Sequence, residues 1–241
     1  MFDPIIISIG PLFLPLSLIV AVCSMFLSVW LAEKLSPEHK HVRRTVSDWL
    51  PTAMLIALLV YKFGPALFNL KEVWHNPAML LYMSGTDTSV LLAALLVVSW
   101  LAWKTVHSPS PWAAADVMAV SGLLTFLVYN ALFKDLGETT SVWWGRGNGD
   151  YRYHPLHVYR VVLLLPLLVW IFRNWKRLES GRVFGEVALW IGIVYTLTSF
   201  VDYRTGGLLL GLTIEQWIGV SLAITGWVFN MIRGRKKGGT G

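Results

Sequence analysis

Residues 153–172 read YHPLHVYRVVLLLPLLVWIF, in which a polar cluster runs directly into a long apolar segment. Pro155 suits the first turn of a helix, where the missing N–H costs nothing, and the segment behind it is long enough to lie in a bilayer. His154, His157 and Arg160 would then lie at or just below a membrane surface. Ionisable groups at that depth are costly and usually mark a functional site. The stretch therefore predicts a membrane helix with a polar site at its entry.

Composition assigns the whole chain to a membrane. Of its 241 residues, 55% are hydrophobic and 14% are charged, and the mean hydropathy is +0.58, whereas soluble domains are about 25% charged. The 13 Trp and 8 Tyr fit aromatic belts at the two interfaces. A net charge of +6 could attract nucleic acid in a soluble chain, but here the basic residues lie in loops between apolar segments. We therefore expect no nucleic-acid partner.

Seven apolar segments each approach the roughly 20 residues that a helix needs to cross the hydrocarbon core. They are residues 10–32, 49–69, 88–106, 114–134, 156–173, 184–203 and 213–232. Most basic residues fall on one side of this arrangement, which puts the N-terminus outside and the C-terminus in the cytoplasm. We predict an all-α integral membrane protein with a single seven-helix transmembrane domain over 1–232 and a basic flexible cytoplasmic tail over 233–241. Loops 70–87 and 135–155 would form a small cap on the outer side.

Short motifs follow one another along the chain. They are Asp3-Pro4 with Ile9-Gly10-Pro11, Lys62-Phe-Gly64, Asn76-Pro77, Asp116, His154-Pro155 with Tyr159, Phe200-Val-Asp202-Tyr-Arg204, and Gly211-Leu-Thr213 with Gln216. Together, in this order, they are similar to the motifs of the phosphatidylglycerol–prolipoprotein diacylglyceryl transferases. The resemblance is spread over the whole length of the chain.

The resemblance implies a multi-pass enzyme of the bacterial cytoplasmic (plasma) membrane. Such an enzyme moves a diacylglyceryl group from phosphatidylglycerol to the thiol of a lipoprotein cysteine and releases glycerol phosphate. Its partners would be phosphatidylglycerol, or another anionic phospholipid, and a prolipoprotein substrate. We also expect a monomer that needs no cofactor.

The chain departs from the motifs of this family at several positions. Ser84–Ser89 stands where the family has His-Gly-Gly, Leu127 stands where it has an arginine, and Asp135 and Arg160 each stand where it has a glutamate. The alternative function is therefore a paralogue with the same fold that binds phospholipid or does different lipid-transfer chemistry. A small transporter is a second alternative, but no pair of symmetry-related segments broken by Gly or Pro supports it.

The implied reaction needs a base for the thiol and cations for the departing phosphate. The candidate catalytic residues are His154, Arg160, Arg204 and Asp87, and the candidate substrate-binding residues are Lys62, Asn130, Asp135, His157, Tyr159 and Asp202. No metal site is expected, because the two histidines have no near third ligand beyond His75 or Asp87.

Each candidate cation also has a structural interpretation. Lys62 could extend to the headgroups without taking part in chemistry, and we weigh this equally with a role in the site. Arg160 is expected to contact a phosphate or a lipid headgroup. Arg204 could instead pair with Asp202 or with Asp87.

The remaining candidates have structural interpretations too. His154 could act as a base, but we favour a role in bracing the helix start, with His157 on nearly the same helix face. Asp87 could also act as a base, but we favour capping of the third predicted helix. Asn130 lies in mid-membrane, where a polar group needs a partner, and is expected to form an interhelical hydrogen bond.

Overall fold

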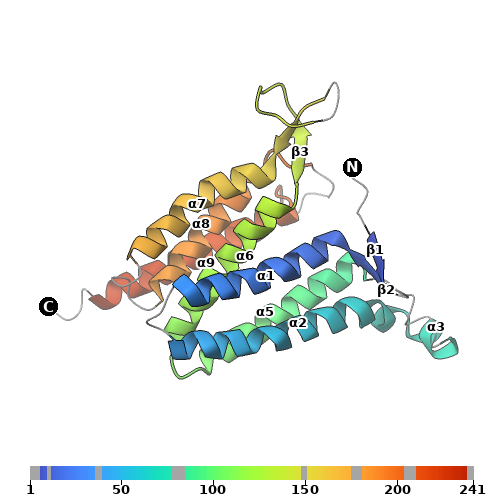
Figure 1. The fold of residues 1–241 in the computed structure, drawn as a ribbon, viewed down its shortest axis with the longest axis horizontal. Helices are drawn as coiled ribbons and strands as arrows, with labels where there is room; N and C mark the ends of the chain where they lie inside the picture. Colours follow the sequence, from blue (N-terminus) through green and yellow to red (C-terminus); the bar gives the residue numbers. More distant parts are fainter. Residues whose placement is uncertain are drawn as a thin grey trace. The chain divides into compact units, whose positions relative to one another are not determined.

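A computed structural model of the chain describes residues 6–9, 12–35, 40–76, 85–147, 151–174, 181–203 and 210–237 (Figure 1). The chain divides into two compact units. The first unit comprises Met1–Cys23 and His39–Ala114, and the second comprises Ser24–Glu38 and Ala115–Gly241. The prediction of a single transmembrane domain over 1–232 stays a prediction.

The first unit opens with a β-hairpin. Strand β1 (Ile6–Ile9) pairs antiparallel with β2 (Leu12–Pro15), and helix α1 (Leu16–Leu35) follows directly. The predicted helix start near residue 10 is therefore wrong. Pro15 has no N–H and disfavours helical geometry at the residue before it, so the helix begins only after this proline.

Two long helices pack together in the first unit. They are α2 (Lys40–Phe68), which starts well before the predicted segment at 49, and α5 (Asp87–Val106). A Cβ at Gly64 would come within 2.9 Å of the Ser89 hydroxyl oxygen, so this glycine permits the close approach of the two helices. Between them, Leu70–His75 forms the short helix α3, in a region predicted to be a loop.

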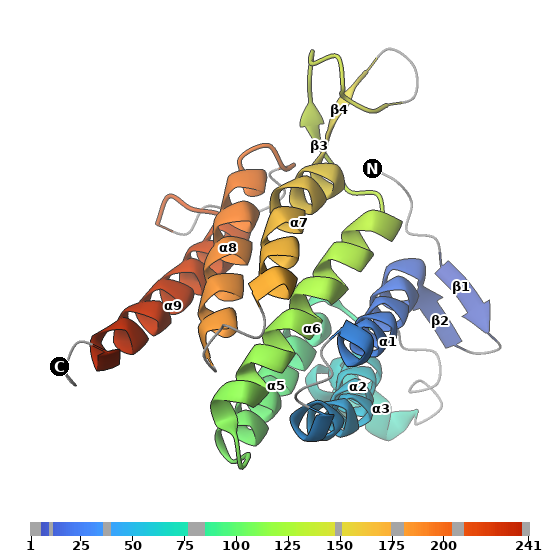
Figure 2. The same ribbon diagram turned by 60° about the vertical axis from the view of Figure 1, so that its left-hand side comes forward.

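Within the described residues, the second unit contains the end of α1 (residues 24–35) and four further helices. They are α6 (Pro111–Leu132, in this unit from Ala115), α7 (Leu156–Asn174), α8 (Arg182–Ser199) and α9 (Ile214–Lys237). Helix α7 packs on α8 and α8 packs on α9 (Figures 1 and 2). The buried apolar core is formed by α6, α7 and α8 through Val120, Leu123, Leu124, Leu127, Leu164, Ile171, Val183, Val187 and Val194.

Glycines bring α8 and α9 into backbone contact. Gly185 and Gly192 on α8, and Gly219 and Gly226 on α9, lie at seven-residue intervals in the sequence. A Cβ at Gly192 would lie 2.5 Å from the carbonyl oxygen of Gly219, and one at Gly226 would lie 2.6 Å from that of Gly185. At Gly192 and Gly226 no side chain larger than hydrogen fits without moving a helix backbone, which is the small-residue packing typical of membrane helices.

Two of the sequence motifs act as helix caps. The Asp116 carboxylate on α6 accepts hydrogen bonds from the backbone N–H groups of Gly181 and of Phe184, the latter at 2.8 Å, and so caps the N-terminus of α8. At the start of α9, the Thr213 N–H donates to Gln216 Oε1 at 3.0 Å and the Gln216 N–H donates to Thr213 Oγ1 at 3.3 Å. This is a capping box, which satisfies two backbone donors at once.

Four helical stretches are long and apolar enough to cross a membrane by length and hydropathy. Within the described residues they are Val46–Leu67, Thr88–Val106, Pro111–Leu132 and Leu156–Asn174. These apolar helices are consistent with a multi-pass membrane protein. Seven spans and the orientation of the termini stay predictions. Helix α9 continues to Lys237, beyond the predicted domain boundary at 232.

Candidate active site at the start of α7

A second hairpin positions the residues around the start of α7. Strand β3 (Leu136–Thr139) pairs antiparallel with β4 (Tyr153–Pro155). The hairpin projects beyond the N-terminal end of α7 in both views (Figures 1 and 2). Predicted as a loop, this region is a small sheet. Because Leu136 lies opposite Pro155, the preceding residue, Asp135, lies beside the first turn of α7.

The segment after α8 is attached to the same hairpin. The Glu138 N–H donates to the Val201 carbonyl oxygen at 2.8 Å. A Cβ at Gly137 would collide with that same carbonyl oxygen, so only glycine permits this approach. The contact brings Asp202, which follows Val201, to the same end of α7 as Asp135.

Arg160 lies between these two aspartates. Its side chain is 9% exposed, its Nη1 is 2.5 Å from Asp135 Oδ2, and its Nη2 is 3.7 Å from Asp202 Oδ2. A buried guanidinium is tolerated only when it is paired and hydrogen-bonded, and here two carboxylates provide the pairing. We refer to Arg160, Asp135 and Asp202 as the charged triad.

Neutral groups complete the surroundings of Arg160. Its Nε donates to Thr198 Oγ1 at 3.3 Å, its Nη1 is 3.5 Å from Asn130 Oδ1, and its guanidinium carbon lies 5.4 Å from the centroid of the Tyr195 ring. The Asn130 contact joins α6 to α7, which confirms the expected interhelical hydrogen bond. The two α8 partners, Thr198 and Tyr195, were not among the predicted site residues, and no local sequence pattern points to them.

The charged triad carries one positive and two negative formal charges. Carboxylates therefore bind the Arg160 guanidinium where a phosphate was expected. An anion would have to displace one of these carboxylates to bind there. Burial raises the pKa of the Asp202 carboxyl, and the nearby Asp135 raises it further, while the Tyr203 N–H and Arg160 oppose these effects. Arg204 lies outside the described residues.

His157 supports the position of Asp135. The imidazole is buried, and its Nδ1 is 2.7 Å from the Asp135 carbonyl oxygen and 3.2 Å from the Asp135 nitrogen. Residues three apart on a helix share a face, so His157 and Arg160 reach Asp135 together. His157 contacts the backbone of Asp135, and Arg160 binds its carboxylate.

The second hydrogen-bonded group links the hairpin to α7. Trp144 Nε1–H donates to the Tyr159 hydroxyl at 2.8 Å, and that hydroxyl is 3.0 Å from His154 Nδ1. The Tyr159 hydroxyl therefore links Trp144 to His154, and the tautomer of His154 sets which of these two residues donates to the other. His154 belongs to β4, so the expectation that it shares a helix face with His157 is wrong. The contact agrees with the favoured bracing interpretation.

Two predicted site residues lie in the first unit, whereas the charged triad belongs entirely to the second. Lys62 is half-buried within α2. Asp87 is the first residue of α5, but the N-cap is Thr86, whose hydroxyl accepts from the Ser89 N–H. The expected capping role of Asp87 is therefore wrong, because the neighbouring threonine performs it.

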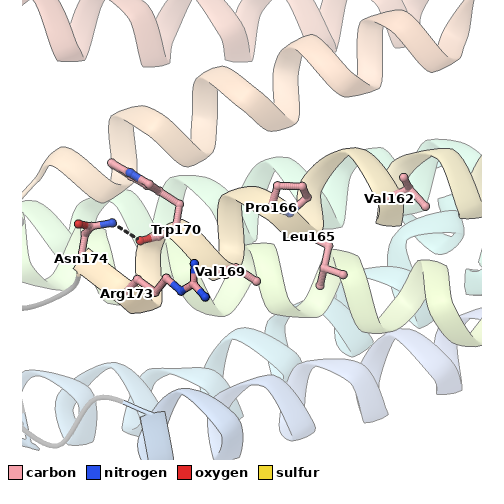
Figure 3. A pocket seen from close by; sticks show the side chains of 7 residues that line it. All are labelled: Val162, Leu165, Pro166, Val169, Trp170, Arg173 and Asn174. Atoms are coloured by element: carbon pink, nitrogen blue, oxygen red, sulfur yellow. Dashed lines mark hydrogen bonds between the residues drawn. The ribbon is translucent and has the colours of Figure 1, made fainter.

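An apolar groove of about 570 Å³ follows one face of α7 (Figure 3). It is lined by Val162, Leu165, Pro166, Val169, Trp170, Arg173 and Asn174. The groove runs from just after Arg160 to the last turn of the helix, where Arg173 and Asn174 are its polar members. Among the residues that the structure describes, no group of three or more His, Cys, Asp or Glu side chains could hold a metal ion.

Comparison with known proteins gives one consistent set of relatives. Proteins named phosphatidylglycerol–prolipoprotein diacylglyceryl transferase from Streptococcus pneumoniae strains Hungary19A-6 and JJA are 25% and 24% identical to this chain. In both cases the alignment covers 98% of this chain and 96% of the relative. No protein-family model matches the chain. Similarity over nearly the whole length of both proteins supports the identification of this chain as a divergent member of the phosphatidylglycerol–prolipoprotein diacylglyceryl transferase family.

Proposed function

We propose that this chain is a phospholipid-dependent transferase of the bacterial cytoplasmic membrane. It moves a diacylglyceryl group from phosphatidylglycerol to a cysteine thiol of a prolipoprotein and releases glycerol phosphate. The names of the relatives support the reaction. The observation that carries the proposal for this chain is the charged triad, a buried arginine paired with two partly exposed carboxylates at the start of an apolar helix.

The chemistry requires one bond to form and one to break. The thiol loses its proton, its sulfur bonds to the terminal glyceryl carbon, and the bond from that carbon to the phosphate oxygen breaks. The triad carboxylates and the imidazoles of His154 and His157 are the candidate proton acceptors. Because the triad occupies Arg160 with carboxylates, we propose Arg204, two residues after Asp202 in the sequence, as a cation for the phosphate.

Complementation in living cells tests this function. The full chain is expressed in bacteria depleted of their own transferase, and a model lipoprotein is analysed by mass spectrometry for thioether-linked diacylglycerol. We expect modification with the wild-type chain and with Glu138→Gln, an exposed carboxylate of the hairpin. We expect none with Arg160→Ala. Absence of the modified lipoprotein at normal expression of the wild-type chain contradicts the transferase function.

The second candidate is a paralogue that binds phospholipid without this transfer. It is favoured by Leu127, which stands where the family has an arginine and which lies buried in the apolar core. The two functions differ in one measurement. Native mass spectrometry that finds phosphatidylglycerol bound to a chain without transferase activity supports the paralogue, whereas a chain with activity excludes it.

A further inference from the structure

The two carboxylates of the charged triad are held differently. Asp135 makes the short contact to Arg160, 2.5 Å, and its backbone is held by His157. Asp202 makes the longer contact, 3.7 Å, and its other oxygen, Oδ1, accepts the Tyr203 N–H at 2.8 Å. Asp135 is therefore the main counter-ion of the buried guanidinium, and Asp202 has the looser interaction.

Among the residues that the structure describes, negative charge exceeds positive charge around Asp202. The charged groups of this part of the chain that act on its carboxylate are Arg160 on α7, Asp135 before β3 and Glu215 in the first turn of α9. Of these three, Arg160 is the only cation, and the Tyr195 phenol on α8 is a neutral titratable neighbour. Partial burial first, and then the negative charges of Asp135 and Glu215, favour the protonated form of Asp202, so its pKa lies above that of an exposed aspartate.

We propose that Asp202 is the catalytic residue that takes the proton from the acceptor thiol. This inference rests on the proposed function. The S–H bond breaks and the proton joins a carboxylate oxygen of Asp202. The thiolate sulfur then bonds to the glyceryl carbon of phosphatidylglycerol, and the bond from that carbon to oxygen breaks with the electron pair leaving on glycerol phosphate. The side chain of Asp202 is 30% exposed, so the proton can pass on to water.

The triad keeps its ion pair through this step. When Asp202 is protonated, the formal charges of Arg160 and Asp135 cancel, and the short contact between them stays in place. Protonation of Asp135 instead would leave the buried guanidinium, among the described residues, with a counter-ion only at 3.7 Å, which is costly for a buried charge. Arg160 and Asp135 therefore act as positioning residues, and Asp202 as the proton acceptor.

The experiment uses the purified full chain in phosphatidylglycerol vesicles with a peptide that carries the acceptor cysteine. The rate of thioether formation is measured across pH, and folding is followed by thermal unfolding. We expect Asp202→Asn to lower kcat/KM by about 100-fold or more, and Asp202→Glu to retain most of it. Glu138→Gln, an exposed carboxylate outside the triad, should change neither the rate nor its pH profile.

A second variant tests the inference without touching Asp202. Glu215→Gln removes a negative charge that raises the pKa of Asp202, so the fall in rate on the acid side should move to lower pH. An unmoved profile, or full activity in a folded Asp202→Asn protein, overturns the assignment while the transferase function stands. An inactive wild-type chain overturns the proposed function and the assignment with it.

Discussion

Arg160 is a buried cation whose charge is balanced by the carboxylates of Asp135 and Asp202. A buried charge pair stabilises a protein less than the attraction between its two ions alone, because both ions lose their hydration. Removal of one partner is nevertheless strongly destabilising.

Asp135→Asn tests this dependence at the level of a single residue. Among the described residues, the substitution leaves the buried guanidinium with the more distant Asp202 as its only counter-ion. A fully buried pair that loses one partner costs about 3–5 kcal/mol, and the 37% exposure of Asp135 puts the expected loss at about 2 kcal/mol. Chemical unfolding in detergent measures it against Glu138→Gln. Equal stability of the two variants would show that the ion pair contributes nothing.

The raised pKa of Asp202 predicts how stability depends on pH. A carboxyl with a folded-state pKa above its unfolded value binds its proton more tightly in the native state. That contribution is present at low pH and is lost as the pH rises through the folded-state pKa. Asp202→Asn, which resembles the protonated form, should therefore be more stable than wild type at neutral pH, with a difference that shrinks on acidification. A lower melting temperature of Asp202→Asn at neutral pH contradicts this sign.

At the scale of elements, glycines set which segments can approach. Gly137 lies where the hairpin meets the segment after α8, and α8 and α9 meet along four glycines. Apolar burial holds such segments together, but the distance between them depends on the absence of side chains at a few positions. The geometry of the charged triad therefore depends on residues that carry no chemistry.

Gly137→Ala tests the link between the hairpin and the site. The added Cβ would collide with the Val201 carbonyl oxygen, so the hydrogen bond from the Glu138 N–H should weaken and Asp202 should move away from Arg160. We expect the free energy of unfolding to fall by about 1–3 kcal/mol. We expect transferase activity to fall by a larger fraction than the free energy of unfolding does. Activity equal to wild type in this variant would show that the hairpin contact does not position Asp202.

Gly192→Val tests the packing of α8 on α9. The valine side chain has no space against Gly219 and Ala223, so we expect destabilisation of about 1–3 kcal/mol. The matched control is Gly122→Ala on α6, where a Cβ meets nothing within 4 Å. Because alanine favours helix by up to about 1 kcal/mol over glycine, the control should be neutral or stabilising in the same thermal unfolding assay.

At the scale of the whole molecule, the membrane topology sets which end of each helix faces outward. The distribution of basic residues predicts that residue 143, in the hairpin region, is outside and that residue 235, near the end of α9, is in the cytoplasm. In a Cys23→Ser background, Trp143→Cys should react with a membrane-impermeant maleimide on intact cells. Arg235→Cys should react only after the membrane is opened. Labelling of both positions from the same side would contradict the predicted topology.

Much of the helical content follows from the sequence because apolar segments of about 20 residues reflect bilayer thickness. Helix α7 begins and ends almost where the sequence predicts, and α6 begins at Pro111, directly after a turn rich in proline. The first predicted helix starts too early because the apolar residues 6–9 and 12–15 pair as two strands, the second of which ends at Pro15. Hydropathy alone does not distinguish an apolar strand from an apolar helix.

The candidate site likewise has one feature that is local in the sequence and another that depends on tertiary packing. The sequence by itself determined that a polar cluster enters an apolar helix at residues 153–160, because this is a local pattern within a single segment. Only the tertiary structure decided that Arg160 pairs with Asp135, 25 residues away, and with Asp202 beyond α8. Such pairing depends on which helices pack together and how closely, and that is set by the buried core and the glycine contacts of distant segments.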